Sequence, residues 1–150
     1  MRARYLFRGQ CVDTGEWYTG HLSRGRHDSE IKRELRPCID YEEVGVMRYC
    51  IVNPETIGQC TGQKDKNGKL IFEGDLLHWE PSKEEIAAYP HVYEGCSFDE
   101  PPAPVKWRIG GWVADCGDDY VCLDDGEALR WTVVGNVHDN PELLEGVKPC

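Results

Sequence analysis

The sequence predicts a mainly β protein built from short strands. Sixteen Gly and nine Pro are spread along the 150 residues, which is typical of a chain with many turns. Runs of aromatic and β-branched residues alternate with clusters of Gly, Asp, Asn and Pro, as strands alternate with turns. Helix signals are confined to a few short stretches. A hydrophobic content of 40% with five Trp and seven Tyr is enough for a core.

The amino terminus is expected to form a β-hairpin. Residues 5–7 and Cys11-Val12 precede the turn Asp13-Thr14-Gly15, and the aromatic and β-branched run 16–22 follows it. Residues 23–36 are polar and charged, and within them residues 29–36 have the pattern of a short amphipathic helix closed by Pro37.

The centre of the chain predicts three strands, at residues 47–52, 69–72 and 75–79, with residues 54–61 as a packed connection. Asp65-Lys66-Asn67-Gly68 is the strongest local signal. Asn-Gly accepts positive φ at both central positions of a type I′ turn, so we expect a hairpin tip there. Gly58 and Gly135, each after an aliphatic residue, are interpreted as backbone positions where bulk is excluded.

The carboxy-terminal half predicts a small β-barrel or β-meander. Ser82 with Glu85 forms a capping box for a short helix that ends before Pro90, and residues 90–104 are expected to be an exposed loop. Four short strands are then expected, at residues 105–109, 112–114, 120–123 and 129–134. Asn140 before Pro141 predicts an N-cap and a single helical turn through Leu144.

The net charge of −10 argues against a nucleic-acid-binding surface as the main function, because phosphate binding draws on clustered Lys and Arg. The charge is uneven: residues 1–36 hold eight Lys or Arg against five Asp or Glu, and residues 37–150 hold nine against 22. A solvated acidic surface explains this balance. An acidic inhibitor that imitates DNA phosphates towards a host DNA-acting protein is the alternative.

Eight cysteines would suggest disulfides in a secreted protein. The amino terminus has positive charges but no apolar segment after them, and no stretch is apolar enough to span a membrane, so we expect a cytoplasmic protein with reduced thiols. No C-x-x-C occurs, and spacings such as Cys116-x5-Cys122 and His91-x4-Cys96 do not indicate zinc. No metal and no cofactor is therefore expected. The cysteines are Cys11, Cys38, Cys50, Cys60, Cys96, Cys116, Cys122 and Cys150.

Three blocks of the chain together resemble the YopX family of small phage and prophage proteins. They are MRARYLFRGQCVDTGEWYTGHL at the amino terminus, PETIGQCTGQKDKNGKLIFEGDLL at residues 54–76 and WTVVGNVHDNPELL at residues 131–144. The resemblance implies an SH3-like small barrel in the carboxy-terminal part. We therefore expect residues 1–46 to be a hairpin with a polar connector and residues 47–150 a YopX-like barrel domain, or one integrated domain over 1–150.

Four polar residues of the central block are candidates for binding a peptide or ligand, because hairpin geometry does not require them. They are Glu55, Thr56, Gln59 and Thr61. The alternative is structural: the threonines bond nearby backbone and Gln59 pairs a buried carbonyl.

No catalytic constellation is evident. His138 beside Asp139, with Asp115, Asp118 and Asp119, is a possible acid–base or metal-hydrolase set, but the family pattern usually has an aromatic residue in place of His138 and likewise of Cys60. Oxygen ligands for calcium or magnesium are conceivable at Asp65, Asn67, Glu73 and Asp75, whose spacing fits a hairpin better.

The sequence therefore favours a non-enzymatic phage or prophage accessory protein. Its β domain is expected to bind itself or a host or phage protein, with a homo-oligomer as the expected state, because the supply of aromatic rings is generous for short strands. The rival classes are an uncharacterised enzyme and a nucleic-acid binder, the latter relying on basic residues near the amino terminus. These are Arg2, Arg4, Arg8, Arg24 and Arg26.

Overall fold

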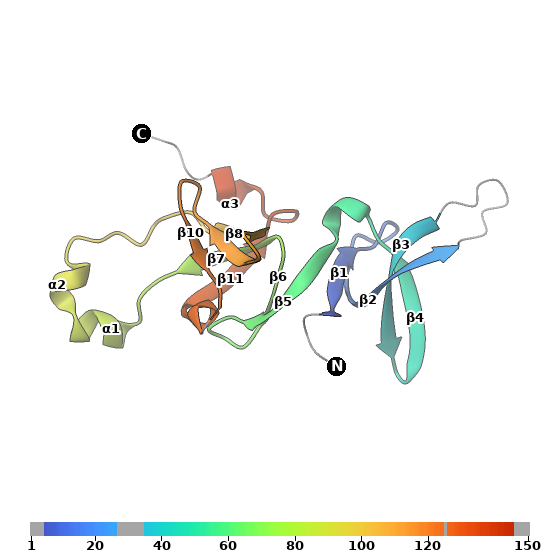
Figure 1. The fold of residues 1–150 in the computed structure, drawn as a ribbon, viewed down its shortest axis with the longest axis horizontal. Coiled ribbons are helices and arrows are strands. Elements are labelled where there is room, and N and C mark those ends of the chain that lie inside the picture. The colour runs from blue at the N-terminus through green and yellow to red at the C-terminus, as the bar shows by residue number, and fades with distance from the viewer. Residues whose placement is uncertain (1–4, 27–34, 125, 146–150) are drawn as a thin grey trace. The chain divides into compact units, whose positions relative to one another are not determined.

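The computed structural model describes residues 5–26, 35–124 and 126–145. The chain forms two compact units, Met1–Gly62 and Gln63–Cys150, called below the N-terminal unit and the C-terminal unit. As predicted, the protein is mainly β: its strands pair antiparallel in two sheets, and its helices are few and short (Figure 1). The boundary expected between residues 46 and 47 falls inside one strand, and the observed division falls inside the next.

The first sheet has the strand order β4-β3-β2-β1-β5-β6. Strands β1 to β4 belong to the N-terminal unit, and β5 continues across the division, so that only its last two residues lie in the C-terminal unit. The elements up to β5 are β1 (Phe7–Gln10), β2 (Trp17–Arg26), β3 (Leu35–Glu43), β4 (Val46–Ile51), the 3₁₀ helix η2 (Pro54–Thr56) and β5 (Gly58–Lys64).

The expected amino-terminal hairpin is confirmed by the pairing of β1 with β2. Gly15, with φ 73°, turns the chain, and the Cys11 N–H donates to the Glu16 carbonyl at 2.8 Å. The helix expected at residues 29–36 is wrong at its end, because Leu35 and Arg36 begin β3 and pair with β2. Residues 29–34 lie outside the described residues.

A bridge between Cys11 and Val52 curls the N-terminal sheet by joining the end of β1 to the end of β4. The Val12 N–H donates to the Ile51 carbonyl at 3.1 Å, and the Asn53 N–H donates to the Gln10 carbonyl at 2.9 Å. A Cβ on Gly9 would lie 2.8 Å from the Val52 side chain, so only glycine allows this approach. The strand expected at residues 47–52 is thus confirmed.

The C-terminal unit contains the second sheet, in the order β10-β9-β8-β7-β11. The hairpin strand β6 precedes it. The elements of the C-terminal unit are β6 (Leu70–Phe72), β7 (Asp75–Trp79), α1 (Lys83–Ala88), α2 (Pro90–Tyr93), β8 (Ala103–Arg108), β9 (Gly111–Asp115), β10 (Tyr120–Cys122), the 3₁₀ helix η3 (Glu127–Arg130), β11 (Trp131–Asn136) and α3 (Glu142–Glu145).

Within the described residues the strand pairings close neither sheet into a barrel. Strand β4 and the first part of β5 pair with the amino-terminal strands, which removes them from the set expected to build a barrel over residues 47–137. Residues 54–61 are also not a plain connection, because β5 begins at Gly58. The expected positions of the strands in the carboxy-terminal half are confirmed to within a few residues.

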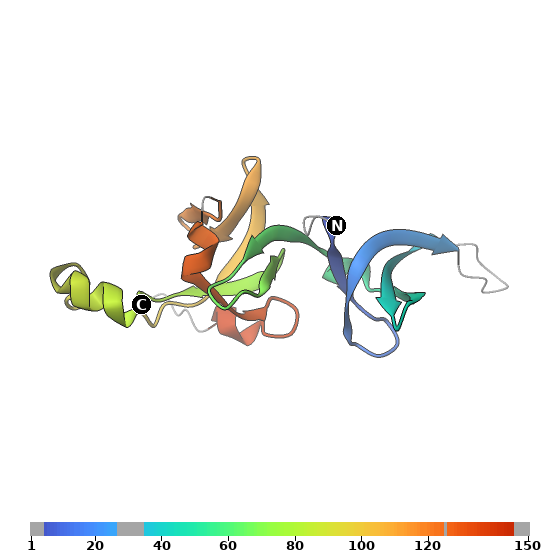
Figure 2. The ribbon, with the colours of Figure 1, turned by 90° about the horizontal axis from the view of Figure 1, so that it is seen from below.

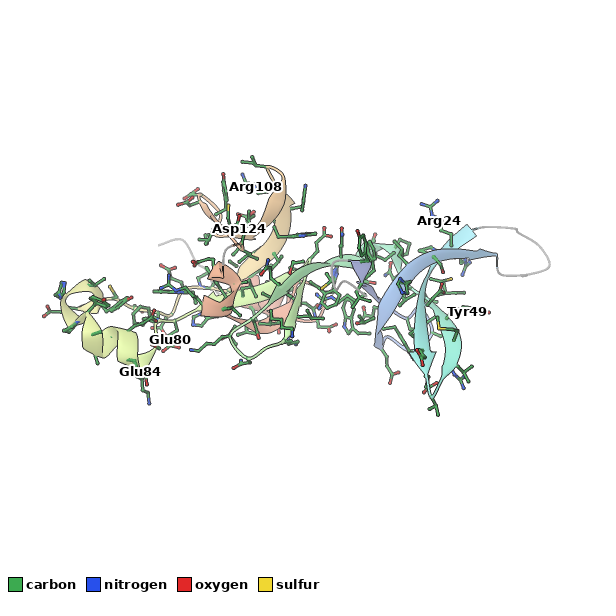
Figure 3. The ribbon with its side chains drawn as sticks, turned by 60° about the horizontal axis from the view of Figure 1, so that its bottom comes forward. Arg24, Tyr49, Glu80, Glu84, Arg108 and Asp124 are labelled. Atoms are coloured by element: carbon green, nitrogen blue, oxygen red, sulfur yellow. The ribbon has the colours of Figure 1, made fainter. Side chains whose placement is uncertain are left out.

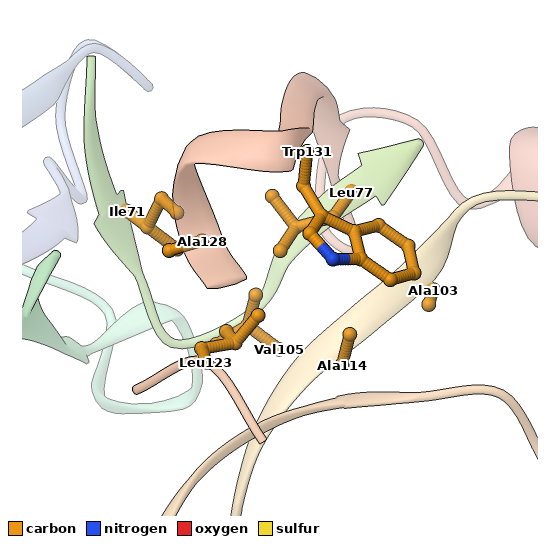
Figure 4. Close-up of a cluster of buried hydrophobic side chains, with 8 residues drawn as sticks. All are labelled: Ile71, Leu77, Ala103, Val105, Ala114, Leu123, Ala128 and Trp131. Carbon is orange, nitrogen blue, oxygen red and sulfur yellow. The ribbon is translucent and has the colours of Figure 1, made fainter. Parts of the chain in front are cut away.

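The core of the C-terminal unit gathers side chains from five strands, from the segment after β10 and from η3 (Figure 4). Leu77 and Ala114 are fully buried, and the large Trp131 ring at the start of β11 is nearly so. The apolar area that these residues remove from water stabilises the sheet. The cluster comprises Ile71, Leu77, Ala103, Val105, Ala114, Leu123, Ala128 and Trp131.

The capping box that starts α1 is confirmed. The Glu85 N–H donates to Ser82 Oγ at 3.1 Å, and the Ser82 N–H donates to Glu85 Oε2 at 2.8 Å. The chain does not enter a loop at Pro90 as expected, because proline is tolerated in the first turn of a helix and begins α2. Both views place α1 and α2 to one side of the C-terminal sheet (Figures 1 and 2).

The end of β11 excludes bulk at Gly135, as expected. A Cβ there would lie 2.5 Å from Asn140 Oδ1, and the pairing with β7 shifts register between Val133 and Gly135. The Asn140 side chain accepts the Asn136 N–H at 3.2 Å. The predicted helical turn through Leu144 is confirmed, since the Leu143 N–H donates to the Asn140 carbonyl at 3.1 Å, but the Asn140 side-chain oxygen accepts from β11 and not from this turn.

The hairpin at Asp65-Lys66-Asn67-Gly68 is confirmed, but its turn type differs from the prediction. Gly68 has φ 80°, whereas Asn67 is not among the residues with positive φ. The Gly68 N–H donates to the Asp65 carbonyl at 3.0 Å, and the Asp65 N–H donates to the Lys69 carbonyl at 2.8 Å. This is a three-residue loop in which a type I turn ends in a left-handed glycine.

The Asp65 carboxylate explains why this turn is preferred over type I′. Its Oδ1 accepts the N–H groups of Asn67 and Lys69, each at 2.9 Å, and its Oδ2 accepts the Val133 N–H at 3.0 Å. The side chain is 1% exposed. A buried carboxylate thus binds three backbone donors and joins the hairpin to β11, while the Lys66 N–H adds a bond to the Trp131 carbonyl at 2.9 Å.

Replacing Gly68 with valine is expected to lower the free energy of unfolding by about 1 kcal/mol or more, because a β-branched residue resists positive φ. Space is not the cause, since nothing lies within 4 Å of a Cβ placed there. Urea denaturation measures the change. Gly111→Val is the matched control, because Gly111 also has open space but lacks positive φ. Equal effects at both positions would contradict the turn.

Replacing Asp65 with asparagine is expected to lower the free energy of unfolding by about 2 kcal/mol, because one of its oxygens becomes an amide donor that faces a backbone donor. Thermal and urea denaturation at neutral pH measure the loss. Asp118→Asn removes an exposed carboxylate as the control. If Asp65→Asn and Asp118→Asn change the free energy of unfolding equally, the three hydrogen bonds to Asp65 contribute no more to stability than the loss of one negative charge does.

Candidate functional site

Two of the four residues predicted to bind a ligand lie in or beside η2. Thr56 is buried, and its hydroxyl donates to the Asn53 carbonyl at 2.7 Å and accepts the Gln10 N–H at 2.9 Å. These bonds fix η2 against the end of β1, which is the structural interpretation of this threonine. Glu55 is exposed, and its N–H donates to Asn53 Oδ1 at 3.1 Å.

The other two residues lie on β5. Gln59 is half-buried opposite Phe7 of β1, and Thr61 is buried. Gln59 and Thr61 each make further interactions within the protein. The structure thus brings the four candidates together in one stretch of the N-terminal unit, where Glu55 is the member most open to solvent.

The outer edge of the N-terminal sheet exposes large apolar side chains, and we call this surface the β4 edge. It consists of Val44, in the turn before β4, and of Val46, Met47 and Tyr49 of that strand. Their exposed fractions are 98%, 54%, 65% and 61%. Figure 3 shows Tyr49 on β4. β4 is the last strand in the sheet order, and apart from its end at Ile51, which accepts the Val12 N–H, its outer side is open to another strand.

Backbone strain marks the turn that leads into the β4 edge. Val44 has φ 51°, a value that costs a β-branched residue energy, and its side chain is almost wholly in water. Ile109 has the same φ and is 83% exposed at the tip of the β8–β9 hairpin. The fold thus holds two β-branched residues in a strained backbone conformation with their side chains in water.

A groove of about 1170 Å³ lies in the C-terminal unit. Its apolar floor includes Leu77, Ala103 and Trp131, and one wall is the proline-rich segment 101–104. The remaining lining residues come from β7, the segment before β8, β8, β9, the β9–β10 turn, β10, η3 and α3. They are His78, Trp79, Glu100, Lys106, Asp115, Cys116, Gly117, Val121, Glu127, Arg130 and Leu144.

Trp131 contributes an unusual polar atom to this region. The residue is 7% exposed, and its indole Nε1 is buried with no hydrogen-bond partner among the described residues. A buried donor without an acceptor costs free energy, and an acceptor from a bound molecule would recover it.

Charged side chains around the groove are largely paired. Asp115 lies 3.1 Å from Lys106 and 3.8 Å from Arg108. The Gly117 N–H, which donates to the carboxylate at 2.9 Å, and then Lys106 hold the pKa of Asp115 below its usual range. Arg130 lies 3.5 Å from Glu85 and 5.6 Å from the centre of the Trp79 ring. The groove thus combines an apolar lining with charged side chains of both signs, most of which are paired with one another.

The residues weighed for catalysis lie at two turns of the C-terminal unit. Asp115, Asp118 and Asp119 lie at the end of β9 and in the β9–β10 turn, and the Asp119 carboxylate accepts the Tyr120 N–H at 2.8 Å. His138 follows β11 and donates its own N–H to Asn136 Oδ1 at 3.0 Å.

The carboxylates weighed for a metal are engaged by backbone. Asp65 accepts three N–H groups, and buried Asp75 accepts the Phe72 N–H at 2.8 Å. Glu73 and Asn67 are exposed turn residues. Over residues 5–26, 35–124 and 126–145, no group of three His, Cys, Asp or Glu is arranged to hold a metal ion.

The basic residues weighed for nucleic-acid binding are only partly described. Arg8 lies 5.0 Å from the centre of the Trp17 ring, and Arg24 is exposed on β2 (Figure 3). Arg2, Arg4 and the side chain of Arg26 lie outside the described part. In that part, no helix is long and apolar enough to cross a membrane.

Sequence reasoning missed both the β4 edge and the groove. The run Val44 to Tyr49 carries the edge signal, because three apolar residues in it lie on an outer strand, but the sheet order cannot be read from one sequence. The groove forms where the side chains of residues 77–79, 101–104 and 127–131 meet. The sequence did not indicate this meeting, because residues 90–104 were expected to be only an exposed loop.

Comparison with known proteins agrees with the resemblance of the three sequence blocks. A family model described as "YopX protein" matches residues 6–145. The crystal structure of protein EF1440 from Enterococcus faecalis is similar at 24% sequence identity and a TM-score of 0.45, over 92% of this chain and 96% of that chain. No curated protein matches. Because the family model spans nearly the whole sequence, this chain belongs to the YopX family.

Proposed function

We propose that this protein is a non-enzymatic protein-binding domain of a phage or prophage, and that it self-associates through the β4 edge. The single observation that carries this proposal is the gathering of exposed apolar residues on a terminal strand, Val46, Met47 and Tyr49, next to the strained and exposed Val44. Apolar side chains and a strand edge in the same place offer a partner both burial and backbone hydrogen bonds.

A second copy is the occupant that this edge fits best. Two identical strands can pair antiparallel about a twofold axis, which buries the same apolar residues on both chains. The opposite end of the sheet order is the three-residue β6, which offers little template for a third copy. Pairing through β4 therefore favours a closed dimer over an open chain of subunits.

The hydrogen bonds of the buried carboxylates support a non-enzymatic role. Catalysis needs acids and bases that meet a substrate, whereas Asp65 and Asp75 accept backbone N–H groups in the interior. We infer further that the C-terminal unit is the counterpart of the SH3-like small barrel that family membership implies. Support comes from its five short antiparallel strands around one core and from the hydrogen bonds that join the β5–β6 turn to β11.

Sedimentation velocity at micromolar concentrations is expected to find a species of about twice the 17.1 kDa chain mass. Met47→Glu places a charge in the proposed interface and is expected to weaken association about tenfold or more, because an unpaired charge would be buried. The matched control is Val92→Glu, which places the same charge at an exposed apolar residue on α2. This variant is expected to leave association unchanged.

A monomer at all concentrations up to about 100 μM would reject the dimer and leave a host or phage protein as the better partner. Dissociation by Val92→Glu but not by Met47→Glu would move the interface away from β4. Both variants are expected to fold, because both changed side chains are exposed. Urea denaturation verifies this.

The groove in the C-terminal unit supports a second function, the binding of a small molecule that combines an apolar ring with a hydrogen-bond acceptor. The observation in its favour is the buried Nε1 of Trp131 without an acceptor in the described structure, in a residue that lines the groove. The apolar floor and the Trp79 ring supply the surface that such a ring would cover.

Titration with benzamide and nicotinamide, followed by the indole N–H signals in nuclear magnetic resonance, tests this function. The Trp131 signal, assigned by its loss in Trp131→Phe, is expected to shift saturably as its donor gains an acceptor. The signal of Trp107, which is 56% exposed and outside the groove, is the internal control. Equal, non-saturating shifts of both signals would contradict binding in the groove.

A further inference from the structure

Cys11 and Cys50 lie on the same face of the N-terminal sheet. Gly9 pairs with Tyr18, so Cys11, two residues beyond Gly9 on the same strand line, faces the same way as Tyr18. Ile39 pairs with Cys50, and Ile39 shares its face with Tyr41, whose ring lies 4.8 Å from that of Tyr18. The register of four strands thus directs both thiols to one side.

The curl of the sheet brings the two thiols together on that side. Cys11 bridges Val52, and Cys50 lies two residues before Val52 on the same face. The two thiols are close enough to shift each other's pKa, and the Cys50 thiol donates to the Ile51 carbonyl at 3.4 Å. Cys11 is 8% exposed, while Cys50 is half-buried on the last strand of the sheet.

The surroundings make the two thiols chemically different. Burial opposes ionisation of Cys11, but hydrogen bonds from Cys50 and from Thr14 lower its pKa from the ordinary value. Burial and the bond to Cys11 raise the pKa of Cys50 to about 12. Cys11 is therefore the more acidic thiol of the two, and Cys50 the less acidic one.

We propose that Cys11 and Cys50 are a redox-active dithiol, which a peroxide oxidises to a reversible disulfide within one chain. The proposal does not depend on self-association, since both thiols belong to the same unit. It assigns the attacking sulfur to Cys11 and the resolving sulfur to Cys50.

The reaction balances in two steps. The Cys11 thiolate attacks one oxygen of hydrogen peroxide, the O–O bond breaks, and with one proton the products are a Cys11 sulfenic acid and water. The Cys50 sulfur then attacks the Cys11 sulfur, the S–O bond breaks, and the thiol proton leaves with the hydroxyl group as a second water. The two sulfurs lose two electrons and the peroxide gains them.

The remaining described thiols serve as comparisons. Cys38 and Cys60 are buried, at 1% and 0% exposed, and the Cys38 thiol donates to the Arg36 carbonyl at 3.5 Å. Cys96, Cys116 and Cys122 are exposed in the C-terminal unit, and burial of its sulfur raises the pKa of Cys116. If exposure alone decided oxidation, these three would react before Cys11.

The full chain is treated with one equivalent of hydrogen peroxide, alkylated, digested and mapped by mass spectrometry. The expected product is a peptide pair joined through Cys11 and Cys50, two hydrogens lighter than the reduced pair and separated again by dithiothreitol. In Cys50→Ser, dimedone is expected to trap a sulfenic acid at Cys11. In Cys11→Ser, Cys50 is expected to stay reduced, and Cys96→Ser is expected to behave as the native chain.

Mapping of the native chain decides the outcome even if a variant fails to fold. Alkylation of both Cys11 and Cys50 after peroxide treatment would overturn the proposal. So would preferential oxidation of the exposed Cys96 or Cys122, or a main product that joins Cys38 to either thiol.

Discussion

The Asp65 carboxylate is the interaction on which the C-terminal unit depends most. It sits at the β5–β6 turn, yet one of its oxygens accepts the N–H of Val133, 68 residues along the chain. A buried carboxylate needs several donors to offset its loss of water, and here three backbone N–H groups supply them. The position of β11 relative to the hairpin is thereby fixed by directional bonds as well as by apolar packing.

This constraint reaches the candidate groove through Trp131. The Trp131 carbonyl accepts the Lys66 N–H in the same turn, while its ring forms part of the groove floor and of the core. In the N-terminal unit the comparable constraint is the Cys11–Val52 bridge, which curls the sheet, gathers two thiols on one face and leaves β4 open along Val46 to Tyr49. Each unit thus combines one long-range backbone link with one accessible surface.

Local signals predicted what depends on neighbouring residues. Ser82 and Glu85 define a capping box within four residues, and Asp13-Thr14-Gly15 defines a turn between two β-prone runs, so both were predictable. Asn67-Gly68 indicated the hairpin but not its turn type, because Asp65 holds the loop through Val133. The pairing of Val52 with Cys11 and the meeting of segments 77–79, 101–104 and 127–131 depend on contacts distant in sequence, which no local pattern reports. Those contacts determine the candidate surfaces.

Amide hydrogen exchange measured residue by residue tests the central role of Asp65 most directly. The N–H of Asn67 lies in an exposed turn and would exchange freely without the carboxylate, whereas that of Val133 lies next to a bulge at the sheet edge. The account predicts that both are protected and that they exchange together with core amides such as that of Leu77, through the same unfolding event. Rapid exchange at Asn67 and Val133 beside a protected Leu77 would contradict it.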